Sequence, residues 1–124
     1  MLIDSNLIIY AAQPANAALR QFIAANGPAV SSISYVEVLG FHRLTPDDEQ
    51  SFRQFFASAE ILQVNQPVLE RAVTLRQQRK MSLGDSLIAA TALAHNRRLL
   101  TRNLDDFSWI AGLQLLDPMA TPSP

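Results

Sequence analysis

The chain has 124 residues, of which 48% are hydrophobic and 17% are charged, and this length and composition predict one globular domain with a substantial core. The sequence contains no cysteine, which excludes disulfides and thiolate zinc sites and suits a reducing cytoplasm, the location that we expect. The formal net charge of −1 gives no general attraction for nucleic acid, and no apolar run reaches the roughly 18–20 residues that cross a bilayer, so no membrane association is expected.

Short apolar runs alternate with helical patterns along the whole chain. Strands are expected at residues 1–4, 29–31, 61–64, 99–100 and 113–116. Residues 5–6 are expected to form a turn, and helices are expected to begin near residues 19, 34, 46, 65 and 83. This alternation predicts an α/β domain with a central, mainly parallel sheet, formed by residues 1–117 and followed by a loose tail at 118–124.

Carboxylates stand where several of these elements begin or end. Asp4 follows the first strand, Glu37 lies in the helix that starts near Ser34, and Asp85 opens a helix that is apolar on almost every face. Sites in open α/β sheets form at the carboxyl ends of the strands. A carboxylate among so many core residues is costly unless its charge is compensated, so these acids are candidates for a functional site.

Each acid also has a purely structural explanation. Asp4 and Asp85 can act as helix N-caps. Ser34-x-x-Glu37 fits a capping box, in which the glutamate accepts a hydrogen bond from the backbone N–H of the serine. The acids at 105–106 fit a surface turn. Taken one at a time, none of these residues requires a functional role.

The three acids are more informative together. If Asp4, Glu37 and Asp85 converge within about 6 Å, each pair repels by roughly 3 kcal/mol at an effective dielectric constant near 20, so cations or protons must neutralise them. Oxygen ligands without cysteine or histidine favour Mg²⁺ or Mn²⁺ over zinc. Magnesium held by one or two carboxylates, with substrate phosphate completing its coordination, is typical of a phosphoryl-transfer site.

Four segments carry these acids: LIDSNLI at 2–8, SYVEVLG at 34–40, GDSLIAA at 84–90 and LTRNLDDF at 100–107. Together, in this order, they resemble the motifs of the PIN domain family, and in particular of the VapC-like toxins of toxin–antitoxin pairs. The fourth segment departs from many relatives, because Asn103 stands where they carry an acid. Toxin-like relatives often have asparagine there and an acid just before the phenylalanine, which here is Asp106.

The resemblance implies a three-layer α/β/α fold and an endoribonuclease that depends on Mg²⁺ or Mn²⁺. Asp4 and Asp85 would be direct metal ligands, and Glu37 would bind the metal or orient a water molecule on it. Asn103 or Asp106 would occupy the fourth catalytic position. Supporting contacts to the site and to the substrate would come from Ser5, Asn6, Thr101 and Arg102. The family further implies homodimers, a cognate antitoxin protein as inhibitor, and RNA as the substrate.

The local basic patch that RNA binding requires is expected beside the third and fourth segments. The candidates are Arg76, Arg79, Lys80, Arg97, Arg98 and Arg102. We expect some of them to bind substrate phosphates, and Arg102, inside the fourth segment, is the best candidate. Arg76 and Arg97 fit a solvated helix end equally well.

Two other functions fit parts of this pattern. Asn103 in place of an acid is compatible with a PIN-like module that has lost catalysis and only binds protein or RNA. An aspartyl-phosphate phosphatase of the α/β type fits less well. Its nucleophilic aspartate is usually followed two residues later by a general acid, and Asn6 holds that place after Asp4.

Overall fold

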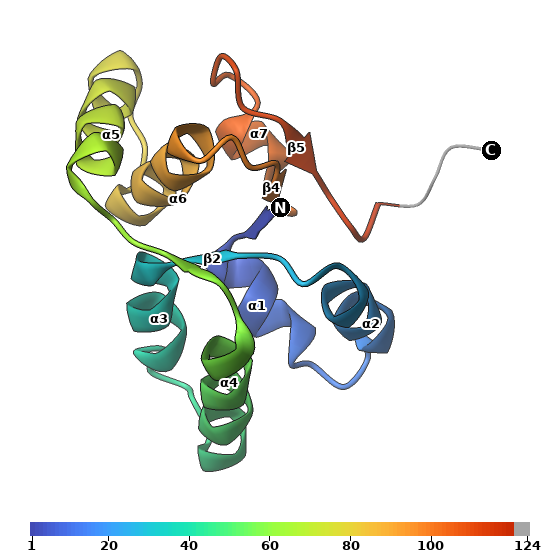
Figure 1. The fold of residues 1–124 in the computed structure, drawn as a ribbon. Coiled ribbons are helices and arrows are strands. Elements are labelled where there is room, and N and C mark those ends of the chain that lie inside the picture. The colour runs from blue at the N-terminus through green and yellow to red at the C-terminus, as the bar shows by residue number, and fades with distance from the viewer. Residues whose placement is uncertain (121–124) are drawn as a thin grey trace.

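In the computed structural model, residues 1–120 are described (Figure 1), and they form seven helices and five short strands. In chain order these are β1 (Leu2–Ile3), α1 (Ser5–Ala11), α2 (Ala17–Asn26), β2 (Val30–Ser31), α3 (Ser32–Leu39), α4 (Pro46–Ser58), β3 (Ile61–Leu62), α5 (Gln66–Gln78), α6 (Leu83–Ala94), β4 (Leu99–Leu100), α7 (Leu104–Phe107) and β5 (Leu115–Leu116). Residues 121–124 of the predicted tail lie outside the described residues. Within residues 1–120, no helix has the length and apolar character needed to cross a membrane.

β1 lies at the centre of five parallel strands. It pairs with β4 through Leu2–Leu99, and β4 pairs with β5. β2 and β3 form a separate two-stranded sheet, which a bridge between Leu2 and Ala29 connects to β1. In the resulting order, β3-β2-β1-β4-β5, the chain adds β2 and β3 on one side of β1 and then β4 and β5 on the other side. Such a switch point opens a crevice outside the carboxyl ends of the strands.

Helices cover both faces of the strands, as Figure 1 shows. Leu2 and Leu99 pack with the buried residues of α5 and α6, whereas Ile3 and Leu100 pack with those of α1, α2 and α4. This division follows from strand geometry, because successive side chains point to opposite faces. The predicted α/β class and the three-layer α/β/α arrangement are confirmed.

The most buried helix is α6. Every residue from 86 to 92 is buried, as its continuous apolar sequence predicts. Its N-cap is Ser82, whose Oγ accepts a hydrogen bond from the Asp85 N–H at 3.1 Å. The interpretation of Asp85 as a cap is therefore wrong, and its carboxylate is not needed to start the helix.

Three boundaries near the acids differ from prediction. Ser5 and Asn6 are not a separate turn, because α1 already begins at Ser5 after the Asp4 cap. α3 begins earlier than expected, at Ser32, because the Ser31 side chain accepts a hydrogen bond from the Ile33 N–H. The four-residue helix α7 was not predicted, since so short a segment shows no helical periodicity.

Candidate functional site

Asp4 lies where β1 ends and α1 begins, with only 5% of its surface exposed. Its Oδ1 accepts a hydrogen bond from the Leu7 N–H at 2.8 Å, so its role as an N-cap is confirmed. Burial raises the pKa of Asp4 and the carboxylates of Asp85 and Glu37 add to that rise, while the Thr101 hydroxyl and the Leu7 N–H oppose it. A cation beside Asp4 would therefore be stabilising.

Glu37 extends from α3 towards α1. Its Oε1 accepts a hydrogen bond from the Ser5 hydroxyl at 2.7 Å, and Ser5 Oγ lies 2.8 Å from Ser34 Oγ. Ser5 has one hydroxyl proton and donates it to Glu37, so the Ser34 hydroxyl donates the hydrogen bond between the two serines. The predicted capping box is wrong, because Ser31 caps α3 and Ser34 lies within the helix. Glu37 is held in place by Ser5 instead.

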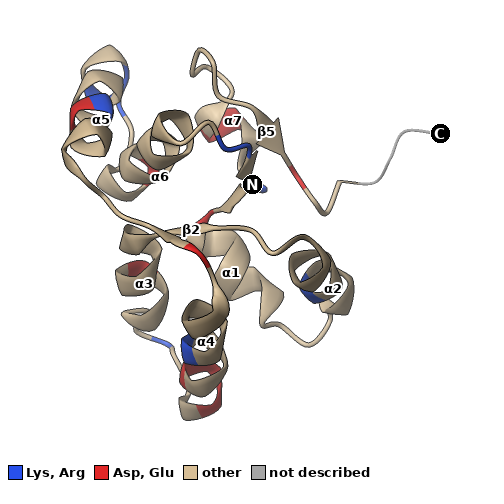
Figure 2. Ribbon diagram, in the orientation of Figure 1, with Lys and Arg blue, Asp and Glu red and all other residues tan. Residues whose placement is uncertain are grey.

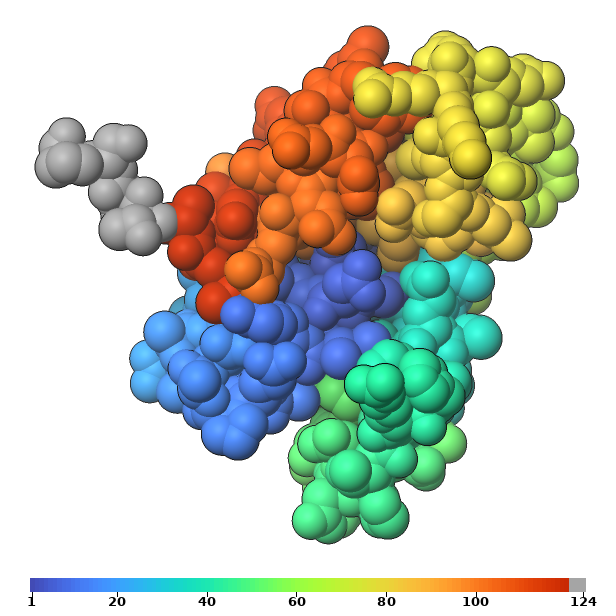
Figure 3. All heavy atoms as spheres, turned by 180° about the vertical axis from the view of Figure 1, so that it is seen from behind, coloured from blue at the N-terminus to red at the C-terminus, as the bar shows by residue number. Residues whose placement is uncertain are grey.

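Asp85 lies in the first turn of α6. Burial raises its pKa, and the carboxylates of Asp106 and Glu37 raise it further, whereas the Ser82 side chain lowers it. Asp106 lies in the first turn of α7, so the structure places it near Asp85. Figure 3 shows that the blue N-terminal segment, cyan α3, golden α6 and the orange segment after it adjoin one another. Acids from four elements thus influence one another electrostatically at this edge of the strands.

These residues fit a hard divalent cation by their chemistry. All candidate donors are oxygen atoms, and the pKa values of buried Asp4 and half-buried Asp85 are raised partly by their acidic neighbours. Among residues 1–120, however, no group of three or more His, Cys, Asp or Glu side chains is arranged to hold a metal ion. Magnesium needs only one or two carboxylates when water and substrate complete its coordination. The residues therefore fit such a site, and a set of three direct ligands stays a prediction.

Gly84 provides the space in which Glu37 lies. A Cβ atom built on Gly84 would collide with Oε2 of Glu37 and would lie 3.2 Å from its Cδ. α6 thus approaches α3 closely enough for the glutamate to lie against its first turn. Sequence reasoning placed Gly84 in a motif but gave it no role, and the only signal was its position next to Asp85.

Three of the other predicted site residues, Asn6, Arg102 and Asn103, line a hollow beside Asp4. The hollow has a volume of about 430 Å³ and is lined by Asp4, Asn6, Leu7, Tyr10, Arg102 and Asn103. Thr101 does not line it but is buried, and its Oγ1 accepts a hydrogen bond from the N–H of the lining residue Asn103 at 3.0 Å. Tyr10 was not among the predicted site residues, because it falls beyond the first motif.

A second hollow of about 430 Å³ adjoins the first. Its lining consists of Arg102, Asn103, Leu104, Asp105 and Asp106. Both candidates for the fourth catalytic position, Asn103 and Asp106, therefore lie at this part of the surface. Asn103 lines the first hollow together with Asp4, and the carboxylate of Asp106 raises the pKa of Asp85.

The predicted basic residues do not form one patch, and Figure 2 shows Lys and Arg segments distributed over several elements. Arg97 forms an ion pair with Glu60 at 3.1 Å. The guanidinium carbon of Arg79 lies 5.5 Å from the ring centroid of Trp109. Of the arginines proposed to contact phosphate, Arg102 is the one that lines the hollow next to Asp4.

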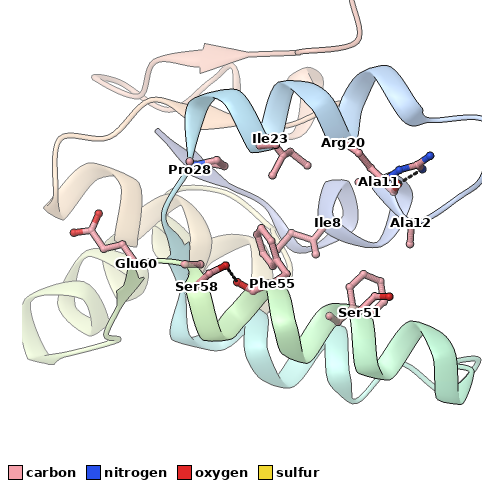
Figure 4. A pocket seen from close by; sticks show the side chains of 14 residues that line it. Ile8, Ala11, Ala12, Arg20, Ile23, Pro28, Ser51, Phe55, Ser58 and Glu60 are labelled. Carbon is pink, nitrogen blue, oxygen red and sulfur yellow. Dashed lines mark hydrogen bonds between the residues drawn. The ribbon is translucent and has the colours of Figure 1, made fainter.

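An apolar groove of about 530 Å³ lies elsewhere, between α1, α2 and α4 (Figure 4). Figure 4 shows Ile8, Ile23 and Phe55 directed into it. Arg20, at its rim, donates to the carbonyl oxygen of Ala11 at 2.8 Å. This groove lacks the converging carboxylates that phosphoryl transfer requires, so the candidate active site is the acidic edge.

The fold and the site define an α/β/α protein with acidic side chains outside the carboxyl ends of its parallel strands. The family model of the PIN domain matches residues 1–113. The chain belongs to the PIN domain family, as its four motifs predict. No curated protein matches the sequence.

Solved structures extend this result. A toxin–antitoxin complex from Klebsiella pneumoniae is similar at 31% identity, over 97% of this chain and 98% of that chain, with a TM-score of 0.77. VapBC2 from Rickettsia felis, bound to a promoter DNA fragment, is 23% identical over 93% and 96% of the two chains, with a TM-score of 0.76. DNA-bound VapBC from Salmonella typhimurium is 20% identical over 94% and 96%, with a TM-score of 0.80. At these identities, the last two similarities show a shared fold and nothing further.

Proposed function

We propose that this protein is an endoribonuclease that depends on Mg²⁺ or Mn²⁺ and hydrolyses RNA phosphodiesters. The observation that carries the proposal is that burial and neighbouring acids raise the pKa values of both Asp4 and Asp85, two partly or wholly buried carboxylates that each feel the charge of Glu37. Such a pair is costly to the fold, and perturbed carboxylates in a crevice are typical of functional sites. The absence of nitrogen and sulfur donors favours a hard cation.

The side chains have distinct roles in this proposal. Asp4 and Asp85 would hold the metal, which when bound polarises the phosphate and favours ionisation of water. Glu37, oriented by Ser5, would accept a proton from the attacking water molecule. Arg102 would bind substrate phosphate, and Asn103 or Asp106 would complete the site.

Magnesium-dependent cleavage of a mixed RNA pool tests the proposal. Asp4→Asn and Asp85→Asn should each abolish cleavage while the far-UV circular dichroism spectrum stays unchanged. Asp48→Asn, which alters a half-buried first-turn acid of α4 outside the site, is the matched control and should cleave normally. Full cleavage by either site variant, or cleavage that persists in EDTA, would contradict the metal-dependent mechanism.

We further propose that the protein is the toxin of a toxin–antitoxin pair in the cytoplasm, inhibited by a cognate antitoxin protein and assembled as a homodimer. The similarity to a toxin–antitoxin complex at 31% identity, over nearly the full length of both chains, supports this. Expression of the wild-type chain should arrest growth, and Asp85→Asn should relieve the arrest. Co-expression with the protein encoded beside it should also restore growth.

A binding module without catalysis is the second candidate. Within residues 1–120, no three His, Cys, Asp or Glu side chains are arranged to hold a metal ion, which favours this candidate. Asn103, where many relatives carry an acid, favours it as well. This alternative expects RNA or protein binding with no cleavage in Mg²⁺ or Mn²⁺. The cleavage assay therefore separates the two functions.

A further inference from the structure

One pair of side chains in the hollow beside Asp4 has no part in metal chemistry. The guanidinium carbon of Arg102 lies 4.2 Å from the ring centroid of Tyr10, a distance at which a cation is attracted to the face of the ring. Tyr10 belongs to α1, whereas Arg102 follows β4. The contact therefore holds an exposed, long side chain at the junction of two elements that lead to the acids.

The ring, rather than a carboxylate, holds Arg102 in place. Both ion pairs within residues 1–120 involve other arginines, Arg53 and Arg97, although two acids follow Arg102 closely in the sequence. No protein carboxylate in this part of the chain therefore satisfies its N–H donors. An arginine presents these donors as a planar fork, which matches the geometry of phosphate.

The hollow around this pair has the properties of a site for one small polar unit. Its volume of about 430 Å³ lies within the range of small-ligand pockets, roughly 300–1,000 Å³. Beside Arg102 and Tyr10 it is lined by the amides of Asn6 and Asn103, which can donate to and accept from a base or a sugar hydroxyl. Asp4, a proposed metal ligand, lies on its wall.

We propose that this hollow binds one nucleotide of a single-stranded RNA, with its phosphate on Arg102, and that Tyr10 is the residue that positions the guanidinium. The inference rests on the ribonuclease function proposed above and adds to it a defined subsite next to the cleavage centre. Arg102 and Asn103 also line the adjoining hollow that contains Asp106, so the bound RNA would continue from the first hollow into the second, past α7.

Binding of a fluorescently labelled single-stranded RNA tests this subsite. The measurement uses Ca²⁺ in place of Mg²⁺, because Ca²⁺ also binds carboxylates, and a gel verifies that the RNA stays intact. Tyr10→Leu should weaken binding by about two- to fivefold, the usual contribution of an exposed cation–π contact. Tyr10→Phe keeps the ring and should bind as the wild type does. Arg102→Ala should weaken binding further and reduce the slope of log Kd against log salt by about one.

The chain offers a matched control in a second arginine–tyrosine contact. Arg53 Nη1 donates a hydrogen bond to the Tyr35 hydroxyl at 2.9 Å on the exposed surface of α3 and α4. Tyr35→Leu should leave RNA binding unchanged. In the Arg102→Ala background, Tyr10→Leu should have no further effect, because the ring acts through the guanidinium.

Two results would contradict different parts of the proposal. If the wild type binds RNA and Tyr10→Leu binds it equally well, or loses no more than Tyr35→Leu loses, the subsite is wrong and the ribonuclease function stands. If the wild type binds no RNA with either Ca²⁺ or Mg²⁺, the ribonuclease function itself is wrong.

Discussion

The contact between Glu37 and Gly84 gives a residue-scale prediction. Gly84→Ala would place a methyl group where the Glu37 carboxylate lies, and the carboxylate can move because it ends a flexible side chain. Alanine is favoured over glycine in a helix by about 1 kcal/mol, so the melting temperature should stay unchanged or rise. Cleavage should fall by about 10- to 100-fold, the cost of displacing a catalytic group by an ångström or so.

Two double variants separate displacement of Glu37 from other causes. In the Glu37→Gln background, Gly84→Ala should cause little further loss, because residues that act together are not additive. In the Gly84→Ala background, Glu37→Asp should partly restore cleavage, because the shorter side chain leaves room for the alanine methyl group. A loss that is the same with and without Glu37 would show that Gly84 acts in some other way.

The roles of some single residues could be predicted from the sequence, and those of others could not. Asp4, Glu37 and Asp85 were identified from their positions beside apolar elements. The hydrogen bond from Ser5 to Glu37 joins residues 32 apart in the sequence, and no local pattern contains it. The capping box was the wrong prediction because Ser31, three positions before Ser34, already caps α3. Tyr10 was missed because it becomes part of the hollow only when β4 brings Arg102 beside α1.

The elements themselves were largely predictable. Each strand lies within a predicted apolar run, and Thr45 caps α4 as its sequence suggests. The extent of the strands was not predictable, because their two-residue ladders depend on which neighbours pair. The start of α6 at Leu83 agrees with the prediction, but the cap is Ser82 and not Asp85.

Ser82 gives the element-scale prediction. Ser82→Ala removes the N-cap of α6 and should cost about 1 kcal/mol of stability. It also removes the side chain that lowers the pKa of Asp85, so that pKa should rise. Because cleavage needs ionised carboxylates, the acidic limb of the pH–rate profile should then move to higher pH.

Thr45→Ala is the matched control at a helix outside the site. Thr45 Oγ1 accepts a hydrogen bond from the Asp48 N–H at 3.1 Å, as Ser82 Oγ does from Asp85 at the same distance. The loss of stability should be similar, but the pH–rate profile should not move. If the pH–rate profiles of Ser82→Ala and Thr45→Ala coincide, Ser82 does not affect the pKa of Asp85 and only stabilises the fold.

At the scale of the whole molecule, the acidic edge joins the two sides of the fold, because Asp4 follows the central strand β1 and Asp85 lies in the first turn of α6, the most buried helix. Burial raises the pKa of Asp4 above its ordinary value of 3.8, so its ionisation destabilises the folded state. That part of the stability is present at pH values below 3.8 and is lost as the pH rises through the raised pKa. Burial therefore disfavours the ionised form of Asp4, and a cation bound beside the carboxylate would stabilise that form.

Melting curves with and without Mg²⁺ test this prediction. At a free metal concentration about ten times the Kd, binding should stabilise the wild type by about 1.4 kcal/mol, or a few degrees in Tm. Asp4→Asn should melt at or above the wild-type temperature at neutral pH without metal, since asparagine caps a helix as well as aspartate does, and Mg²⁺ should not raise it further. Asp48→Asn should keep the wild-type response. An equal Mg²⁺ shift in Asp4→Asn and the wild type would mean that the cation binds elsewhere and that the acidic edge is not the metal centre.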